Sequence, residues 1–185
     1  MRRITATALS LILLAVLPAQ ADPEEDFHLC ATIADDHAEA IRRCTAAIES
    51  GALSDHRLSL TYSNRAYEHQ VLELFEQALA DAVRATEIDP KNAMAWGQRG
   101  LANLAMGRED AAVEEFHQTL RVVDELGNTV ATVGNSAEFT AAANLAQIYE
   151  ERGNGAAVPG PLQRAHRIQP NHSGMRALYR KYGLN

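Results

Sequence analysis

The chain repeats a pattern of residues at a fixed interval of 34 positions. Residues 62–66, Tyr-Ser-Asn-Arg-Ala, return as residues 96–100, Trp-Gly-Gln-Arg-Gly. The same interval links three further pairs: Ala78 with Ala112, Asp81 with Glu115, and Ala85 with Thr119. A unit of this length is too small to bury a core by itself, so units of this kind must stack against their neighbours.

A less regular third copy lies nearer the C-terminus. Leu145 and Ala146 are followed by Tyr149, and Ala165 is followed five positions later by Pro170. Together with the two regular copies, this pattern resembles the tetratricopeptide repeat (TPR) family, whose unit of about 34 residues pairs two helices. The resemblance implies an all-α fold, a right-handed α-solenoid of antiparallel helix hairpins with a C-terminal capping helix. The N-terminal residues described below add the expectation of an exported bacterial member of the family.

The resemblance also divides the chain into segments. The second helix of the third copy is interrupted by Pro159 and Pro161, because proline cannot occupy a helix interior without breaking it. The expected segments are a degenerate leading hairpin over 22–58, repeats over 59–92 and 93–126, a polar insert over 127–138, a third repeat with a broken second helix over 139–172, and a capping helix over 173–185.

The composition fits packed helices and argues against several classes of protein. The chain is 46% hydrophobic and 22% charged, which is enough to fill a core, and only 5% aromatic. Its 17 basic and 24 acidic residues give a formal charge of −7, which disfavours nucleic acid as a partner because binding phosphates needs a basic face. Its two lysines are Lys91 and Lys181, so no lysine-rich anion site is expected.

Residues 1–21 have the pattern of a secretory signal peptide. Two arginines precede an apolar stretch over residues 4–17, and Ala19-Gln20-Ala21 has the small side chains of a cleavage site. The stretch is shorter than the roughly 20 residues that span a membrane, and a retained N-terminal anchor is the alternative. Cleavage before Asp22 removes the two arginines and changes the charge from −7 to −9. We therefore expect a periplasmic protein with no membrane insertion after cleavage.

The chain has two cysteines, Cys30 and Cys44. Export places them in an oxidising compartment, where an even number of cysteines favours a disulfide, here one that clamps the leading hairpin. Two buried thiols that pack as small hydrophobic groups are the alternative. A zinc site is not expected, because no second cysteine pair and no histidines have the spacing of zinc ligands.

The sequence contains no recognisable catalytic or cofactor-binding motif. Its seven histidines form no His-x3-His pair, and the turn at Gly153-Asn154-Gly155 lacks the lysine of a phosphate-binding loop. Adjacent acids such as Glu114 and Glu115 point about 100° apart on a helix, so they are poor acid–base partners. We therefore expect no enzyme activity, no cofactor and no metal site.

Two arginines recur with the repeat, and an acid follows each of them after 16 positions. Arg65 precedes Asp81, and Arg99 precedes Glu115, by this distance. Sixteen residues span one helical hairpin, so we expect an ion pair within each repeat that sets the register of its two helices. The alternative is that the arginines bind a carboxylate of a partner peptide, which is disfavoured because the acid recurs together with the arginine.

By resemblance to the TPR family, the first helix of each repeat lines a concave groove. The side chains expected to face it are Asn64, Tyr67, Gln70, Gln98, Leu101, Asn144 and Gln147. Amides both donate and accept hydrogen bonds, as a peptide backbone requires, and a tyrosine adds a flat apolar surface. The sequence therefore predicts a non-catalytic protein–protein interaction module, a scaffold or adaptor of the cell envelope that binds a peptide segment. The alternative is an accessory subunit of an envelope enzyme complex that contributes a ligand-binding surface.

Overall fold

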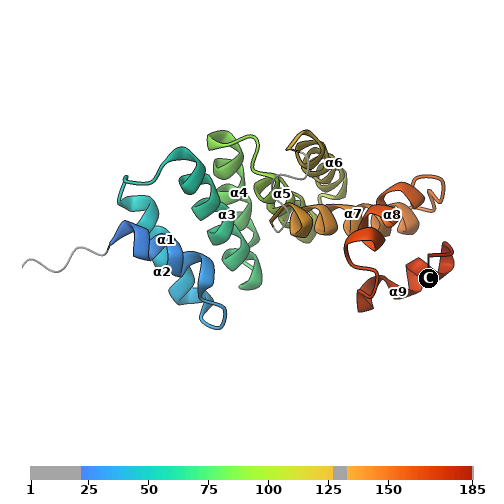
Figure 1. Ribbon diagram of the computed structural model, residues 1–185, viewed down its shortest axis with the longest axis horizontal. Helices are drawn as coiled ribbons and strands as arrows, with labels where there is room; N and C mark the ends of the chain where they lie inside the picture. Colours follow the sequence, from blue (N-terminus) through green and yellow to red (C-terminus); the bar gives the residue numbers. More distant parts are fainter. Residues whose placement is uncertain (1–21, 127–132, 185) are drawn as a thin grey trace, which may run out of the picture.

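The described part of the molecule is built from helices. A computed structural model describes residues 22–126 and 133–184, and within these ranges the chain forms nine α-helices, one short 3₁₀ turn and no strand. The helices follow one another in chain order, from the blue α1 to the red α9 (Figure 1). The signal peptide predicted for residues 1–21 lies outside the described residues. The elements are α1 (Pro23–Thr32), α2 (His37–Glu49), α3 (Asp55–Val71), α4 (Phe75–Ile88), α5 (Ala93–Ala105), α6 (Glu109–Leu126), α7 (Val133–Glu151), α8 (Pro159–Ile168), the 3₁₀ turn η2 (Ser173–Met175) and α9 (Arg176–Lys181).

Successive helices pack in pairs, and the pairs pack in a row. Helix α1 contacts α2, α3 contacts α4, α5 contacts α6, and α7 contacts α8. The first helices of neighbouring pairs also contact each other, α1 with α3, α3 with α5 and α5 with α7, whereas no two second helices are in comparable contact within the described residues. We call the surface formed by α1, α3, α5 and α7 the first-helix face. The right-handed sense of the solenoid stays a prediction.

Two helices begin earlier than the sequence-based segments placed them. Helix α3 begins at Asp55, four residues before the boundary at residue 59, because Ser54 is extended and its carbonyl already accepts a hydrogen bond from Leu58 N at 2.8 Å. Helix α7 begins at Val133, so residues 133–138 of the expected insert are helical, while residues 127–132 lie outside the described part of the chain. Tertiary packing explains the second difference, because Ala137 and Glu138 are buried there.

The turn inside three of the helix pairs uses a residue with positive φ. Gly107 (φ 72°) follows α5 and Gly153 (φ 69°) follows α7, and glycine takes this conformation easily because it has no Cβ. The equivalent residue after α3 is Glu73, with φ 58°. This conformation costs a residue with a side chain roughly 1–2 kcal/mol, so the α3–α4 turn is the strained one of the three.

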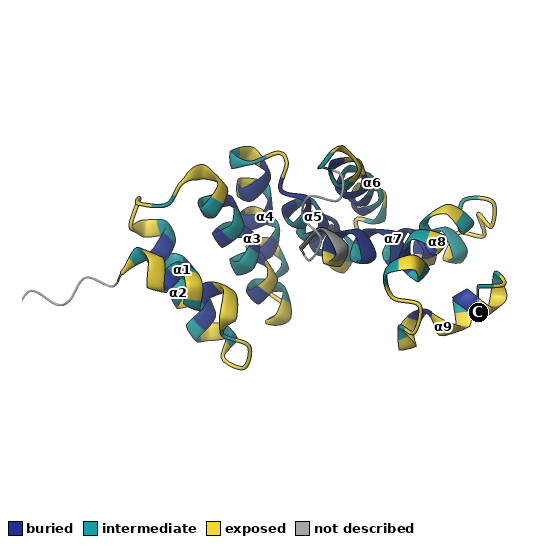
Figure 2. Cartoon of the chain, viewed as in Figure 1, coloured by how far each residue is buried: buried dark blue, intermediate teal, exposed yellow. Residues whose placement is uncertain are grey.

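Small side chains let the paired helices approach closely, and buried positions face inward on each pair (dark blue in Figure 2). Phe116 of α6 is fully buried over Gly100 of α5, where an added Cβ would lie 2.5 Å from Phe116 Cε1. The residues 34 positions earlier are Ala66 and Ala82, both fully buried. The two helix pairs therefore fill equivalent positions with different side chains, glycine with phenylalanine and alanine with alanine.

The largest core cluster runs from α6 to the C-terminus. Phe116, Leu145 and Leu162 are fully buried in it, and Met175 and Tyr179 close its far side. A stack of repeats needs such a closing element, because its last repeat otherwise exposes an apolar face. The closing element is η2 with the six-residue helix α9, which is shorter than the capping helix expected over residues 173–185.

Candidate functional site

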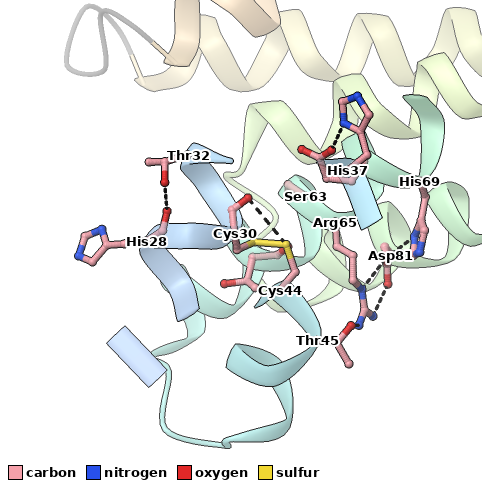
Figure 3. Close-up of a disulfide and its surroundings, with 12 residues drawn as sticks. His28, Cys30, Thr32, His37, Cys44, Thr45, Ser63, Arg65, His69 and Asp81 are labelled. Atoms are coloured by element: carbon pink, nitrogen blue, oxygen red, sulfur yellow. Dashed lines mark hydrogen bonds and ion pairs between the residues drawn. A yellow bond between two sulfur atoms is a disulfide. The ribbon is translucent and has the colours of Figure 1, made fainter. Parts of the chain in front are cut away.

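The first recurring arginine, Arg65 on α3, is held by an acid of α4. Its guanidinium donates two hydrogen bonds to Asp81, from Nε to Oδ2 at 2.8 Å and from Nη2 to Oδ1 at 2.7 Å, and a third to Thr45 Oγ1 at 2.9 Å (Figure 3). His69 Nδ1 lies 3.0 Å from Asp81 Oδ2. Burial opposes the charge of Asp81, but its contacts with His69 and Arg65 outweigh burial and hold the pKa of Asp81 below its usual value.

The second recurring arginine, Arg99 on α5, has fewer partners. Its Nη2 lies 2.7 Å from Glu115 Oε1 on α6, and its Nη1 donates to Thr86 Oγ1 at 3.0 Å. Arg99 Nε is buried and has no hydrogen-bond partner in the described residues. Burial raises the pKa of Glu115 above its usual value in spite of the arginine. Both recurring arginines are thus engaged by acids of their own helix pair.

The two cysteines join the first two helices. Cys30 on α1 and Cys44 on α2 form a disulfide with their Cα atoms 4.8 Å apart (Figure 3). Arg43 adds a second link, because its Nη1 donates to Asp26 Oδ1 at 3.0 Å and Asp26 is 2% exposed. These two links hold α1 against α2.

A hollow of about 230 Å³ opens between the C-terminal end of α1 and the C-terminal half of α3. Residues 30–34 form one wall, and Asn64, Tyr67 and Glu68 form the other. Asn64 and Tyr67 are two of the residues predicted to face the groove, and Tyr67 is 50% exposed. Pockets for small molecules have volumes of about 300–1,000 Å³, so this hollow better suits one side chain of a larger partner.

Glu68 is the charged residue of this hollow, and the sequence analysis did not single it out. Its side chain is only 7% exposed, and its Oε2 lies 2.6 Å from His37 Nδ1 at the start of α2. Its other oxygen, Oε1, accepts no hydrogen bond within the described residues. A lone acid on a helix is usually solvated, and the burial of Glu68 follows from the packing of α1 and α2 on α3, which no local sequence signal reveals.

The large apolar side chains that are exposed in the described chain all lie in one stretch, residues 67–74. They are Tyr67, Val71, Leu72 and Leu74, which we call the α3 apolar patch. Tyr67 and Val71 are four positions apart on α3, so they share one face of the helix, and Tyr67 also lines the hollow. Exposed apolar residues that gather in one place mark interaction surfaces, whereas isolated ones need no explanation.

The middle of the predicted groove is more deeply involved in the fold. Gln70 and Gln98 are half-buried, and Gln98 Oε1 is buried without a hydrogen-bond partner in the described residues. Leu101 is also half-buried and packs against the large core cluster. Part of the Leu101 side chain therefore serves the core rather than a free surface.

The C-terminal part of the predicted groove contacts the fold's own elements. Asn144 Nδ2 donates to the carbonyl of Thr140 at 2.8 Å. Gln147 is exposed, and its Nε2 lies 3.4 Å from Met175 Sδ of η2. The structure thus places Asn64 and Tyr67 together at the hollow and leaves Asn144 and Gln147 at a separate place on α7.

The described residues contain no group of three or more histidine, cysteine or acidic side chains that could hold a metal ion. None of their helices combines the length and the apolar character needed to cross a membrane. The buried acids contact basic side chains, as Asp26 does with Arg43 and Asp81 with Arg65. What the first-helix face offers is apolar contact, amide hydrogen bonding and one buried carboxylate at the hollow.

Known proteins resemble parts of the chain. No protein-family model matches it. Over 87 residues, 47% of the chain, it is 31% identical to the small glutamine-rich tetratricopeptide repeat-containing protein 2 of Saccharomyces cerevisiae, of which it covers 24%. Over 89 residues, 48% of the chain, it is 30% identical to the serine/threonine-protein phosphatase 5 of Homo sapiens, of which it covers 17%. Over 55 residues it is 42% identical to the serine/threonine-protein phosphatase T of Aspergillus oryzae, of which it covers 12%.

The chain thus spans less than a quarter of the length of each of these relatives. Matches of this extent do not carry the phosphatase activity in two of the names over to this chain. They do agree with the 34-residue period and the paired helices, since one relative is named for the repeat itself. About half of the chain is thus similar to a protein that is named for the tetratricopeptide repeat.

Proposed function

We propose that the chain is a non-catalytic protein–protein interaction module that binds a segment of a partner polypeptide on its first-helix face. One observation carries this proposal. The large apolar side chains exposed in the described chain gather in the α3 apolar patch, and one of them, Tyr67, also lines the hollow between α1 and α3. Tyrosine is a frequent interface anchor, because its ring buries a large area and its hydroxyl still forms a hydrogen bond.

The packing of the helices supports this choice of face. Neighbouring first helices contact each other, whereas neighbouring second helices are not in comparable contact within the described residues. A row of units that is more closely spaced on one side curves toward that side, which makes the first-helix face the concave one. A bound segment on a concave face contacts several repeats at once, as recognition of an extended or helical peptide requires.

Polar groups on the same face suit a peptide backbone. Asn64 is a half-buried amide that lines the hollow, and Gln147 is an exposed amide on α7. An amide can accept from a backbone N–H and donate to a backbone carbonyl, so such residues bind main chain without selecting one side chain. The size of the hollow favours a polypeptide partner over the small ligand that an accessory enzyme subunit would bind.

The proposed setting is the bacterial cell envelope, where the chain serves as a scaffold or adaptor of the periplasm. Residues 1–21 have the composition of a secretory signal, and disulfides such as Cys30–Cys44 persist mainly in oxidising compartments. Both features support export of the chain to an oxidising compartment such as the periplasm.

Partner capture with matched surface variants tests the proposal. Tyr67→Ala combined with Asn144→Ala should reduce recovery of a specific partner from envelope extract several-fold and leave Tm nearly unchanged. The control combines Gln77→Ala and Gln163→Ala, two exposed residues of the second helices α4 and α8, and should capture as the parent does. Unchanged capture by the first variant, or loss only in the control, would place the binding surface on the other side of the molecule.

A further inference from the structure

We propose that the hollow between α1 and α3 binds an arginine side chain of the partner segment. This inference rests on the proposed function and specifies the chemistry of the partner. The guanidinium lies between the C-terminal end of α1 and the carboxylate of Glu68, and its aliphatic stem lies against the ring of Tyr67. The residues after the arginine reach the α3 apolar patch.

The α1 wall of the hollow offers hydrogen-bond acceptors and contains no basic side chain in the last turn of the helix. A helix leaves its last four carbonyls without partners inside the helix. In α1 the Leu29 carbonyl accepts from Ile33 N at 3.1 Å, whereas the carbonyls of Ala31 and Thr32 accept no hydrogen bond within the described residues. The last turn of α1 contains no basic residue, and a helix C-terminus carries partial negative charge. This wall therefore favours a cation.

The opposite wall supplies a carboxylate. Glu68 is more than nine-tenths buried and lines the hollow, with Oε2 bound to His37 and Oε1 without a hydrogen-bond partner in the described residues. Oε1 is not among the buried atoms that lack a partner, so it keeps contact with solvent and can accept a hydrogen bond from a side chain that enters the hollow. Arginine fits better than lysine, because its planar group carries five N–H donors for the several acceptors of this lining, which include Glu68 and the Asn64 amide oxygen.

The same junction of α1 and α3 already holds one guanidinium in this way. Arg57 on α3 lies over the Phe27 ring of α1, 5.2 Å from its centroid, and forms an ion pair with Glu24. That site combines an aromatic ring with a carboxylate, as the hollow does with Tyr67 and Glu68 at the other end of the junction. The hollow thus has the same pair of groups, an aromatic ring and a carboxylate, and we propose that the partner supplies its guanidinium.

Charge is unevenly distributed, and the hollow lies in the acidic part. Residues 22–74 contain eleven acids, four arginines and no lysine, a balance of −7, whereas residues 75–184 contain thirteen acids and eleven basic residues, a balance of −2. The four arginines of the acidic part all form ion pairs with acids; they are Arg42, Arg43, Arg57 and Arg65. The negative electrostatic field of residues 22–74 attracts a basic segment of the partner. Because these four arginines are already paired, the hollow can take an arginine of that segment.

Two matched peptides test this inference on the full-length protein with its disulfide intact. Acetyl-Ala-Leu-Arg-Leu-Ala-amide and the same peptide with glutamine in place of arginine are titrated against ¹⁵N-labelled protein. The arginine peptide should shift the amide signals of residues 31–34 and 64–68 and bind about tenfold more tightly than the glutamine peptide. Shifts spread over the whole acidic surface would overturn the proposal.

Three variants locate the interaction. Glu68→Gln should weaken the arginine peptide about tenfold, whereas Glu151→Gln removes the same charge from an exposed site on α7 and should change affinity less than about twofold. Ala34→Phe fills the hollow from an exposed position and leaves Glu68 unsubstituted. It therefore tests the proposal independently if Glu68→Gln does not fold. Equal loss in Glu68→Gln and Glu151→Gln, or full binding by Ala34→Phe, would contradict the proposal.

The outcomes separate this inference from the proposed function. If both peptides bind the first-helix face equally well, the interaction module stands and its preference for arginine is wrong. If neither peptide shifts the signals of the hollow, the arginine site is wrong, and the capture experiment with the Tyr67 and Asn144 variant decides the function independently.

Discussion

The α3–α4 and α5–α6 helix pairs share one sequence pattern 34 residues apart, yet they hold their arginine differently. Arg65 forms two hydrogen bonds to Asp81 and one to Thr45, with His69 close to the same carboxylate. Arg99 has Glu115 and Thr86, and its Nε has no hydrogen-bond partner in the described residues. Equivalent positions thus bring equivalent charges together, while the neighbouring side chains decide how well each charge is satisfied.

The same two pairs also differ in packing and in their turns. Gly100 and Phe116 occupy the positions that Ala66 and Ala82 occupy in the earlier pair, and Gly107 occupies the position of Glu73. From the earlier pair to the later one, the second helix gains a larger side chain, phenylalanine for alanine, and the first helix has a smaller one, glycine for alanine. The two helices can therefore still approach closely. At these two positions the repeat therefore constrains the combined size of the facing side chains more tightly than the size of either one.

Removing the phenylalanine should have the largest effect on this comparison. Phe116→Ala leaves a cavity and should lower the free energy of unfolding by about 3–5 kcal/mol. Gly100→Ala alone forces a Cβ against the ring and should cost about 1–3 kcal/mol. In the Phe116→Ala background, Gly100→Ala should instead stabilise by roughly 0.5–1 kcal/mol, because the ring is gone and a helix interior prefers alanine. Urea unfolding of the four proteins measures this cycle.

Gly97 on the same helix provides the control for the cycle. An added Cβ there would meet only Thr119 Oγ1, at 3.9 Å, an ordinary contact. Gly97→Ala should therefore leave stability unchanged or raise it slightly. Additive effects of Gly100→Ala and Phe116→Ala would mean that the two residues do not compensate for each other.

The two acids should differ next. Asp81→Asn removes the charge that Arg65 binds with two hydrogen bonds and should cost about 2–3 kcal/mol. Glu115→Gln should change the free energy of unfolding by less than about 1 kcal/mol, because burial already offsets what the carboxylate gains from Arg99. Both substitutions keep the shape of the side chain, so chemical denaturation compares the charges alone. A larger cost for Glu115→Gln would reverse the order of the two sites.

The turns should give a smaller effect of opposite sign. Glu73→Gly removes strain at φ 58° and should stabilise by about 0.5–1 kcal/mol. Gly107→Ala introduces the same strain after α5 and should destabilise by about 1 kcal/mol. An added Cβ meets no other atom there, so backbone strain is the whole expected cost. Thermal unfolding of both variants checks the signs, and a loss of stability in Glu73→Gly would show that this side chain has a stabilising role of its own.

The pH dependence of stability should show the smallest difference. The folded pKa of Asp81 is lowered, so its contribution is present above the unfolded value of about 3.9 and is lost as pH falls through the folded pKa. The folded pKa of Glu115 is raised, so its charge costs stability above that pKa, and the cost disappears as pH falls toward about 4.3. Below about pH 4, stability should fall less steeply in Asp81→Asn than in the parent. Between pH 7 and about pH 4, stability should fall more steeply in Glu115→Gln than in the parent. Parallel profiles would contradict both assignments.

Some features of this molecule follow directly from the sequence, because they depend on spacing. A period of 34 with small residues at fixed positions indicates paired helices, and an interval of 16 brings Arg65 opposite Asp81 and Arg99 opposite Glu115. The disulfide follows from similar reasoning, since two cysteines on neighbouring helices have one possible intramolecular pairing.

Other features depend on how elements pack, and spacing does not contain them. The hollow arises where α1 meets α3, so the burial of Glu68 and its contact with His37 have no local signature. The early start of α7 depends on partners from later in the chain, because the buried Glu138 binds Arg164 of α8. Leu101, expected in the groove, packs partly against the core cluster that continues to the C-terminal elements.

Site-specific photocrosslinking tests most directly whether the partner binds the first-helix face. A photoreactive amino acid replaces Tyr67 on α3 in one protein and Gln77 on α4 in the other; both residues are exposed. Each protein is irradiated in envelope extract, and its crosslinked products are identified by mass spectrometry. The proposal predicts one recurrent crosslinked polypeptide from position 67 and none from position 77. The same product from position 77, with none from position 67, would contradict it.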